Sequence, residues 1–189
     1  MAINVNDEGR PWSVSGGGPV LVIPAELAAH WRGTSPPLGA TVPPGWQWGS
    51  PNGPTCDYDR ACKPTHAEST GFGGFGSVSV GDGQAIVLDA EVVTEWFADG
   101  DGGCLIRKAY DESTPDPAVA PWKPFPGITT LTLTDGRLFF FDSAFVGDAD
   151  PDQITAHDGV GVIQLAPGTY AIECAEDDGE NDYVRFRRL

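Results

Sequence analysis

Basic side chains are scarce in this 189-residue chain. It contains 11 Lys and Arg against 27 Asp and Glu, which gives a formal net charge of -16 and a pI near 4.2. Nucleic-acid binding depends on Lys and Arg side chains that displace phosphate counterions, so this composition excludes a nucleic-acid partner. The only basic concentration lies at 185–188, where we expect a final strand whose arginines pair with the acidic run at 176–182.

Long apolar runs are also lacking. No stretch of about 18 consecutive apolar residues occurs, and no basic segment followed by an apolar one begins the chain, so the sequence predicts a cytoplasmic protein without a membrane partner. Cysteines in that compartment are expected to be reduced thiols. Cys56, Cys62 and His66 could donate to a metal, but their spacing differs from that of ordinary zinc sites. We therefore expect no metal and no cofactor.

The familiar catalytic signatures are missing as well. There is no Gly-x-Ser-x-Gly elbow, and the glycine-rich loop at 71–76 is not followed by a helix with Lys-Ser or Lys-Thr. Asp148, Asp150 and Asp152 begin like a calcium loop, but the glycine and glutamate that complete such a loop are absent. The sequence predicts that the protein is not an enzyme and that these aspartates form an exposed acidic loop at the start of a short helix.

Glycine and proline are abundant, with 25 and 17 residues, and this favours many short elements joined by turns. A chain of this length can bury roughly 70% of its unfolded surface in one core. The sequence therefore predicts a strand-rich α+β protein with a few short helices, folded as a single domain over residues 1–189.

An internal repeat is indicated by residues 74–88 and 159–173. Three glycines coincide when the segments are aligned, and each segment is typical of a β-hairpin. We predict two pseudo-repeated halves around a shared core; the alternative is a chance alignment of glycine-rich hairpins. The halves span about 12–114 and 126–189, and residues 115–125 connect them. Further expected elements are apolar strands at 18–24 and 136–142, a strand at 104–110, a helix or crossover at 89–99, and a hairpin over 128–134 and 137–142.

Two short helices are expected near the N-terminus. The first spans 24–31, with proline in its first turn, and ends at Gly33. The second covers 56–62, so that Tyr58 and Cys62 share a face, with Arg60 at the rim in an ion pair or in contact with a partner. Residues 34–54 between them cannot form a regular element, and Trp46 and Trp48 in this loop either cap the core or contact a partner.

These motifs resemble the immunity protein 21 family of bacterial polymorphic toxin systems. The family is described by a Trp-x-Gly and a Tyr-x-x-x-Cys motif in a strand-rich α/β domain, and Trp31, Gly33, Tyr58 and Cys62 match it, after a Gly-Gly-Pro-x-Leu strand at 17–21. The resemblance covers the chain from about Trp12 to the C-terminus. It implies a monomeric protein of bacterial competition that binds and neutralises a cognate toxin by covering its active or substrate-binding surface.

The acidity of the chain suits a basic toxin, and against a nuclease it would act partly as a nucleic-acid mimic. We expect the partner contacts at Trp46, Trp48, Tyr58, Arg60, Asp148, Asp150 and Asp152. One alternative is a small-molecule-binding domain or enzyme with a pocket between the two halves, lined by Trp46, Trp48, Phe72 and Phe75. A scaffold protein without a ligand is a third interpretation.

Overall fold

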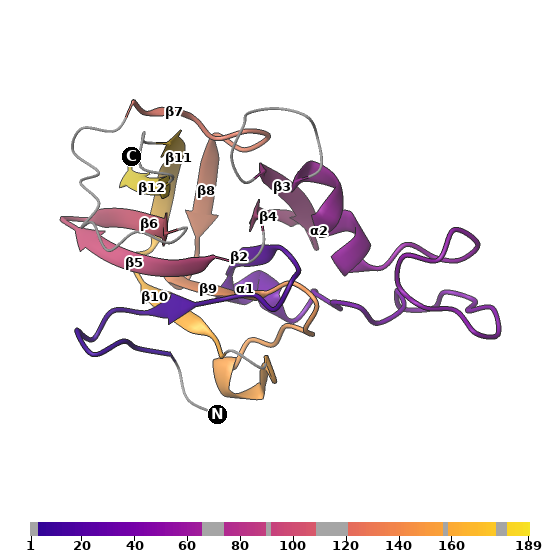
Figure 1. Ribbon diagram of the computed structural model, residues 1–189. Helices are drawn as coiled ribbons and strands as arrows, with labels where there is room; N and C mark the ends of the chain where they lie inside the picture. The colour runs from indigo at the N-terminus through magenta and orange to yellow at the C-terminus, as the bar shows by residue number, and fades with distance from the viewer. Residues whose placement is uncertain (1–3, 66–73, 90–91, 109–120, 157–158, 177–180) are drawn as a thin grey trace.

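A computed structural model describes residues 4–65, 74–89, 92–108, 121–156, 159–176 and 181–189. Two antiparallel sheets face each other, and the helices lie on the outer side of the smaller one (Figure 1). The described elements are β1 Trp12–Ser13, β2 Val20–Pro24, α1 Ala25–Ala28, α2 Asp57–Thr65, β3 Phe75–Val80, β4 Gly83–Leu88, β5 Val93–Asp99, β6 Gly102–Lys108, β7 Lys123–Pro124, β8 Thr130–Leu133, β9 Arg137–Asp142, η2 Pro151–Gln153, β10 Gly161–Gln164, β11 Gly168–Glu176 and β12 Asn181–Arg188. The strand-rich α+β prediction is confirmed. Among the described residues, no helix is long and apolar enough to cross a membrane.

The smaller sheet has the strand order β10-β9-β2-β4-β3 and is buried on both faces. Strand side chains alternate between faces, so Val20 and Val22 of β2 point to the larger sheet while Leu21 and Ile23 point to the helices. The same alternation in β9 directs Phe140 inward between the sheets and Phe139 outward. A strand that is covered on both faces needs a continuous run of apolar residues. β2 and β9 have such runs and pair with each other at the centre of this sheet.

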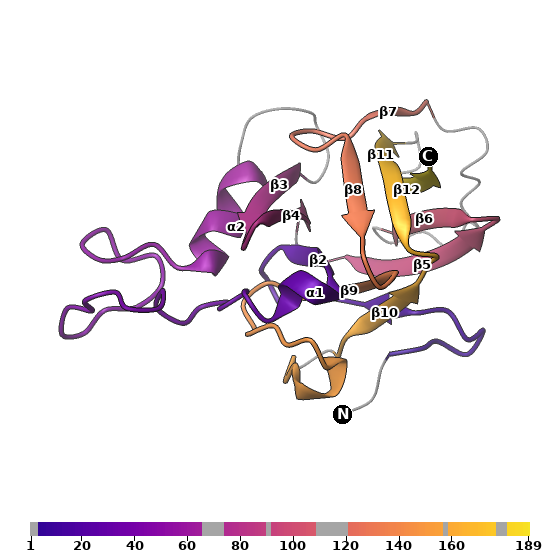
Figure 2. The ribbon, with the colours of Figure 1, turned by 180° about the vertical axis from the view of Figure 1, so that it is seen from behind.

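The larger sheet has the order β1-β5-β6-β12-β11-β7, and β8 also pairs with β11. Its inner face supplies Trp96, Leu105, Val184 and Phe186 to the core between the sheets. Its outer face carries a smaller apolar cluster in which Cys104, Ile106, Ala175 and Tyr183 lie beneath the partly buried Phe97 and Trp122. Figure 2 shows the two sheets from behind.

Several predicted pairings are wrong, although most strands lie where they were expected. The hairpin at 74–88 forms as β3 and β4, but the one at 159–173 does not. β10 pairs with β9 in the smaller sheet, whereas β11 pairs with β12 in the larger one. The hairpin over 128–142 fails for the same reason, because β8 pairs with β11 and β9 pairs with β2.

The physical cause is that turns at 135–136 and 166–167 carry the chain from one sheet to the other. A turn that crosses between sheets uses the same Gly and Pro residues as a hairpin turn, so local sequence does not separate the two. The prediction of a helix or crossover at 89–99 is also wrong, since most of this segment forms strand β5. Both predicted halves contribute strands to both sheets; the duplication itself stays a prediction.

The final strand forms as β12. Among the described residues its arginines pair outside the predicted acidic run, of which 177–180 lie outside the described ranges. Arg185 contacts Glu173 of β11 at 2.7 Å, and Arg187 approaches the same carboxylate at 3.6 Å. Asp182 of the predicted acidic run instead pairs with the buried Arg107 at 2.9 Å. Antiparallel pairing of β11 with β12 places Glu173 directly opposite Arg185, which accounts for the contact.

We expect Phe140→Ala to lower the free energy of unfolding by about 3–5 kcal/mol, because the ring is fully buried between the sheets and its removal leaves a cavity. Urea unfolding followed by tryptophan fluorescence measures the change. Thr41→Ala, at an exposed loop position, is the control and should stay within about 0.5 kcal/mol of the parent. Equal effects would contradict the placement of Phe140 in the shared core.

Stability should also fall at alkaline pH through Cys104. Burial raises the pKa of this thiol from 9.0 to about 12. As the pH rises from 9 to 12, the unfolded chain releases a proton that the folded chain keeps, so the stabilisation present below pH 9 is lost. We expect the free energy of unfolding to fall more steeply with pH in the parent than in Cys104→Ala, by up to about 1.4 kcal/mol per pH unit. Parallel curves from urea titrations across this range would contradict the prediction.

Candidate functional site

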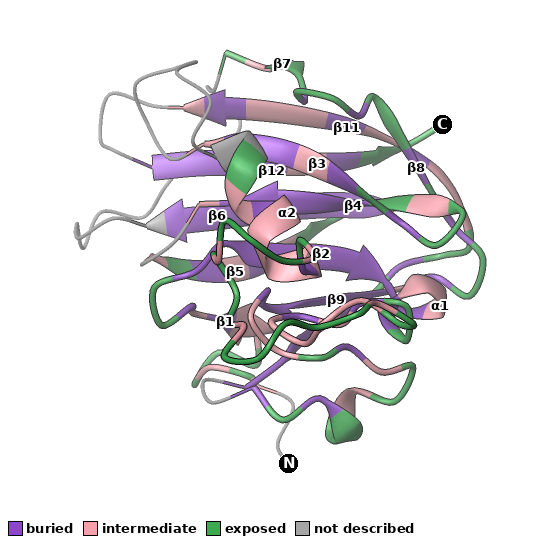
Figure 3. Cartoon of the chain, turned by 90° about the vertical axis from the view of Figure 1, so that its right-hand side faces the viewer, coloured by how far each residue is buried: buried purple, intermediate pink, exposed green. Residues whose placement is uncertain are grey.

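The segment 34–55 projects from one end of the molecule as a long loop, which we call the arm (Figure 1). It contains turns and bends but no helix or strand, as predicted, and none of its residues is buried. Figure 3 looks onto this end and shows the arm in exposed and intermediate colours in front of α2. The arm also contains no Asp, Glu, Lys, Arg or His, although 20% of the residues in the whole chain are charged.

The two motifs of the sequence lie at the two ends of the arm. Trp31 to Gly33 lead into it, and α2 begins directly after it. The backbone N–H of Tyr58 donates to the carbonyl of Gly33 at 3.0 Å. The N–H of Arg32 donates to the Asp57 carboxylate at 2.8 Å. These contacts join the residues before the arm to those after it, and we call this junction the clasp.

Trp31 and Gly33 fix the clasp to the body of the protein. Trp31 is fully buried, and its indole N–H donates to the Ser143 carbonyl at 2.9 Å. Gly33 has φ +55° and packs so tightly that a Cβ atom would lie 2.6 Å from the Phe145 carbonyl oxygen and closer still to that of Ala144. Only glycine meets both conditions without strain, which explains the glycine of the Trp-x-Gly motif.

Tyr58 and Cys62 share one face of α2, as their spacing predicts, and their side chains are hydrogen-bonded to each other. The Tyr58 ring lies against Gly18, where a Cβ atom would be 2.5 Å from the ring. Burial, followed by the negative charge of Cys62 and Asp142, raises the pKa of Tyr58 to about 12. The Tyr58 side chain packs against the backbone at Gly18.

The arm is tied back onto α2 by Asp59. Its carboxylate accepts hydrogen bonds from the backbone N–H of Gly49 at 2.8 Å and of Cys56 at 3.2 Å. Trp48 packs edge-to-face on Tyr58, with the ring centroids 5.1 Å apart, yet remains 54% exposed. Trp46 is half-buried against Gly53 within the arm itself. Trp48 is thus the indole presented to solvent, whereas Trp46 helps to shape the arm.

The remaining predicted contact residues lie around the clasp. Arg60 pairs with Asp57 at 2.7 Å and donates to the Ser79 carbonyl of β3, so it is held within the molecule. The acidic loop of Asp148, Asp150 and Asp152 is exposed or half-buried and leads into the short helix η2, as predicted, with Asp150 accepting from the Asp152 N–H at 3.1 Å. This loop follows Gly147, whose N–H donates to the Trp31 carbonyl at 3.0 Å.

The arm, the outer side of α2 and the acidic loop thus meet around the clasp, and we call them together the contact face. The sequence did not lead us to Gly18, Asp59 and the segment 142–147 as the residues that support the contact face. Asp142, for example, accepts from the N–H groups of Gly16 and Ala144 at 3.0 and 2.9 Å. A run of three glycines at 16–18 was the available signal, because such a run indicates close backbone approach.

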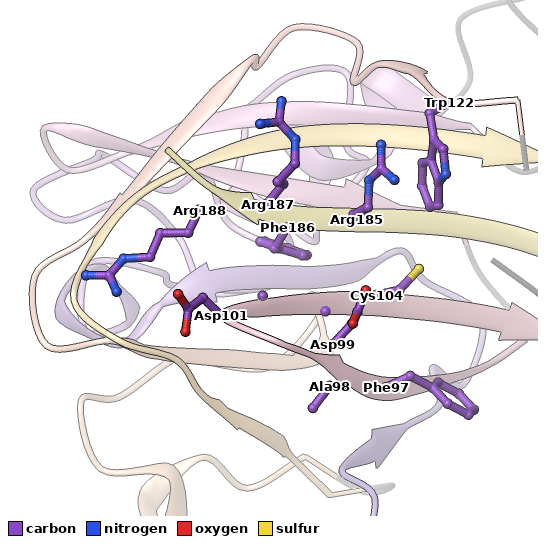
Figure 4. A pocket seen from close by; sticks show the side chains of 12 residues that line it. Phe97, Ala98, Asp99, Asp101, Cys104, Trp122, Arg185, Phe186, Arg187 and Arg188 are labelled. Carbon is purple, nitrogen blue, oxygen red and sulfur yellow. The ribbon is translucent and has the colours of Figure 1, made fainter. Parts of the chain in front are cut away.

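A cavity of about 500 Å³ lies elsewhere, on the outer face of the larger sheet (Figure 4). Phe97 and Cys104 line one part of it and Trp122 and Arg185 another, with the Arg185 guanidinium 4.0 Å from the Trp122 ring centroid. The predicted pocket between the halves does not form around its expected residues. Phe75 is buried against Phe125 between the sheets, apart from the two arm tryptophans, and Phe72 lies outside the described residues.

All four cysteines are free thiols. Within the described ranges, no cluster of three or more His, Cys, Asp and Glu side chains is placed to hold a metal ion. His66, the third residue of the Cys56 and Cys62 pattern, lies outside those ranges.

These features describe a sandwich of two sheets that carries a long exposed loop. The chain belongs to the immunity protein 21 family, whose model matches residues 11–182, a span that includes both motifs and the whole arm. No curated protein and no solved structure matches the chain significantly. Family membership makes it an immunity protein directed against a toxin.

The clasp predicts unequal effects of alanine at two glycines with similar positive φ. Gly33→Ala meets the 144–145 backbone, whereas Gly39→Ala at φ +74° points into open space. Both substitutions incur backbone strain of about 1–2 kcal/mol, and Gly33→Ala should lower the free energy of unfolding by at least about 1 kcal/mol more. Urea unfolding of both variants tests this. Equal losses would mean that the clasp does not constrain the fold.

Proposed function

We propose that this protein neutralises a cognate bacterial toxin in the cytoplasm by binding it directly, as a monomer, so that the active or substrate-binding surface of the toxin is covered. The observation that carries the proposal is the contact face. The family motifs hold together an exposed arm and an adjacent acidic loop, and neither motif forms a catalytic constellation. Side chains that hold an exposed loop in place suit a protein that recognises another macromolecule.

The charge of the chain supports a basic partner. At -16, the protein attracts a basic surface over a distance, and such steering raises association rates by roughly 10-fold to 1000-fold at low salt. Asp148, Asp150 and Asp152 place part of this charge beside the arm. Nucleic acid is not a partner in this proposal, because the same field repels phosphate.

Co-expression with the protein encoded by the adjacent gene tests the function. The chain should restore growth of cells that produce that protein and should co-purify with it in a 1:1 complex. Loss of both rescue and co-purification would reject the proposal for that pair.

The role of the acidic loop is tested by its neutral variant, Asp148→Asn/Asp150→Asn/Asp152→Asn. Asparagine keeps a side-chain carbonyl that can accept the backbone hydrogen bonds of this loop, so the change is mainly one of charge. We expect the association rate to fall roughly 3-fold to 10-fold at low salt and to converge with the parent rate at high salt. Surface-based kinetics with the purified partner measure both rates.

The matched control, Asp7→Asn/Asp99→Asn/Asp101→Asn, removes the same amount of charge from exposed positions. Asp99 and Asp101 flank the turn between β5 and β6, which lies away from the arm (Figure 1), and Asp7 belongs to the turn that Asn6 joins to Glu95 of β5. Its association rate should fall less than 3-fold, because the removed charges lie farther from the contact face. Equal effects of the two triple variants would mean that net charge alone steers the association and that the acidic loop does not contact the toxin.

A further inference from the structure

The arm differs from the rest of the protein in its chemistry. In the whole chain, 20% of residues are charged, so a stretch as long as 34–55 would be expected to hold about four charged residues, yet it has none. The clasp marks the boundary, since Arg32 precedes the arm and Asp57 and Asp59 follow it. The surface that extends farthest from the acidic body is therefore electrically neutral.

The neutral arm also exposes apolar side chains. Leu38 is 84% exposed, Val42 is 41% exposed and Trp48 is 54% exposed. In the described part of the chain, these three account for nearly half of the large apolar side chains that are left in solvent. Burying one such side chain contributes about 1.5–3 kcal/mol to association, which corresponds to roughly 10-fold to 150-fold in affinity.

The arm is ordered before it meets a partner. Backbone hydrogen bonds close three turns, from the N–H of Ala40 to Pro37, of Trp46 to Pro43 and of Ser50 to Gln47, each at 3.1 Å. Prolines fix the backbone at 36–37 and 43–44. A loop that is already shaped loses little conformational entropy on binding, so most of the apolar burial is retained as affinity.

We propose that the arm inserts into an apolar, uncharged cleft of the toxin and determines how slowly the complex dissociates, while the acidic body determines how fast it forms. The inference rests on the proposed function and adds the chemistry of the partner surface. Charged walls in such a cleft would lose hydration against Leu38, Val42 and Trp48 without gaining a hydrogen bond, so an apolar lining is the complementary one.

Leu38 provides the sharpest test, because its exposure means that a substitution disturbs no contact of the fold. Leu38→Glu and Leu38→Lys are measured against the purified product of the adjacent gene, in an inactive form. An apolar cleft rejects either charge, so both variants should raise the dissociation rate at least about 10-fold. Their association rates should stay within about 3-fold of the parent rate.

The matched controls are Val5→Glu and Val5→Lys, which make the same additions of charge at a side chain that is 56% exposed in the segment bridged to Pro11, next to β5. Their dissociation rates should equal that of the parent. Circular dichroism and thermal unfolding of all four variants establish that each one is folded.

Two results would overturn the inference while the proposed function stands. In the first, the parent binds and neutralises the toxin but both Leu38 variants dissociate like the Val5 controls. In the second, Leu38→Glu tightens the complex and Leu38→Lys loosens it, which would assign a basic surface to the site of the arm. Failure of the parent chain to bind would instead reject the proposed function itself.

Discussion

The approach of Gly33 to the backbone at 144–145 is the contact on which the contact face depends. It brings the start of the arm against the segment that follows β9, at a distance that excludes any side chain. The fully buried Trp31 holds the same segment from the other side through its hydrogen bond to Ser143. Because β9 pairs with β2 at the centre of the smaller sheet, the arm is anchored to the most deeply buried part of the fold.

This anchoring explains why the family motifs combine aromatic, glycine and thiol residues. Trp31 and Gly33 secure the entry to the arm, and Tyr58 and Cys62 secure the helix at its exit, with Tyr58 packed over Gly18. Asp59 then ties Gly49 back to that helix. The clasp is therefore built from close packing and from backbone N–H groups that donate to the Gly33 carbonyl and to the Asp57 carboxylate. A rigid base of this kind can present a surface without taking part in its chemistry.

Local sequence predicted most of the elements and few of the long-range pairings. The apolar runs of β2 and β9 and the four-residue spacing of Tyr58 and Cys62 are local signals, and each was interpreted correctly. The proline at 24 does precede α1, but this helix ends at Ala28, so the prediction of a helix over 24–31 was too long. The sheet partners of β8 and β10 depend on which neighbours surround them, and a Gly or Pro turn is compatible with either a hairpin or a crossing between sheets. The supports of the clasp were missed because contacts such as Gly33 with Ala144 join residues more than a hundred positions apart.

No side chain between Thr34 and Thr55 contributes to either sheet, and the clasp holds the arm mainly through backbone groups at its base. Substitutions on the outward side of the arm therefore carry little penalty for folding. The scaffold separates the residues on which stability depends from exposed residues that can vary, and under the proposed function these exposed residues recognise the toxin. A fold partitioned in this way can acquire a new target by exchange of one loop, much as an antibody domain does.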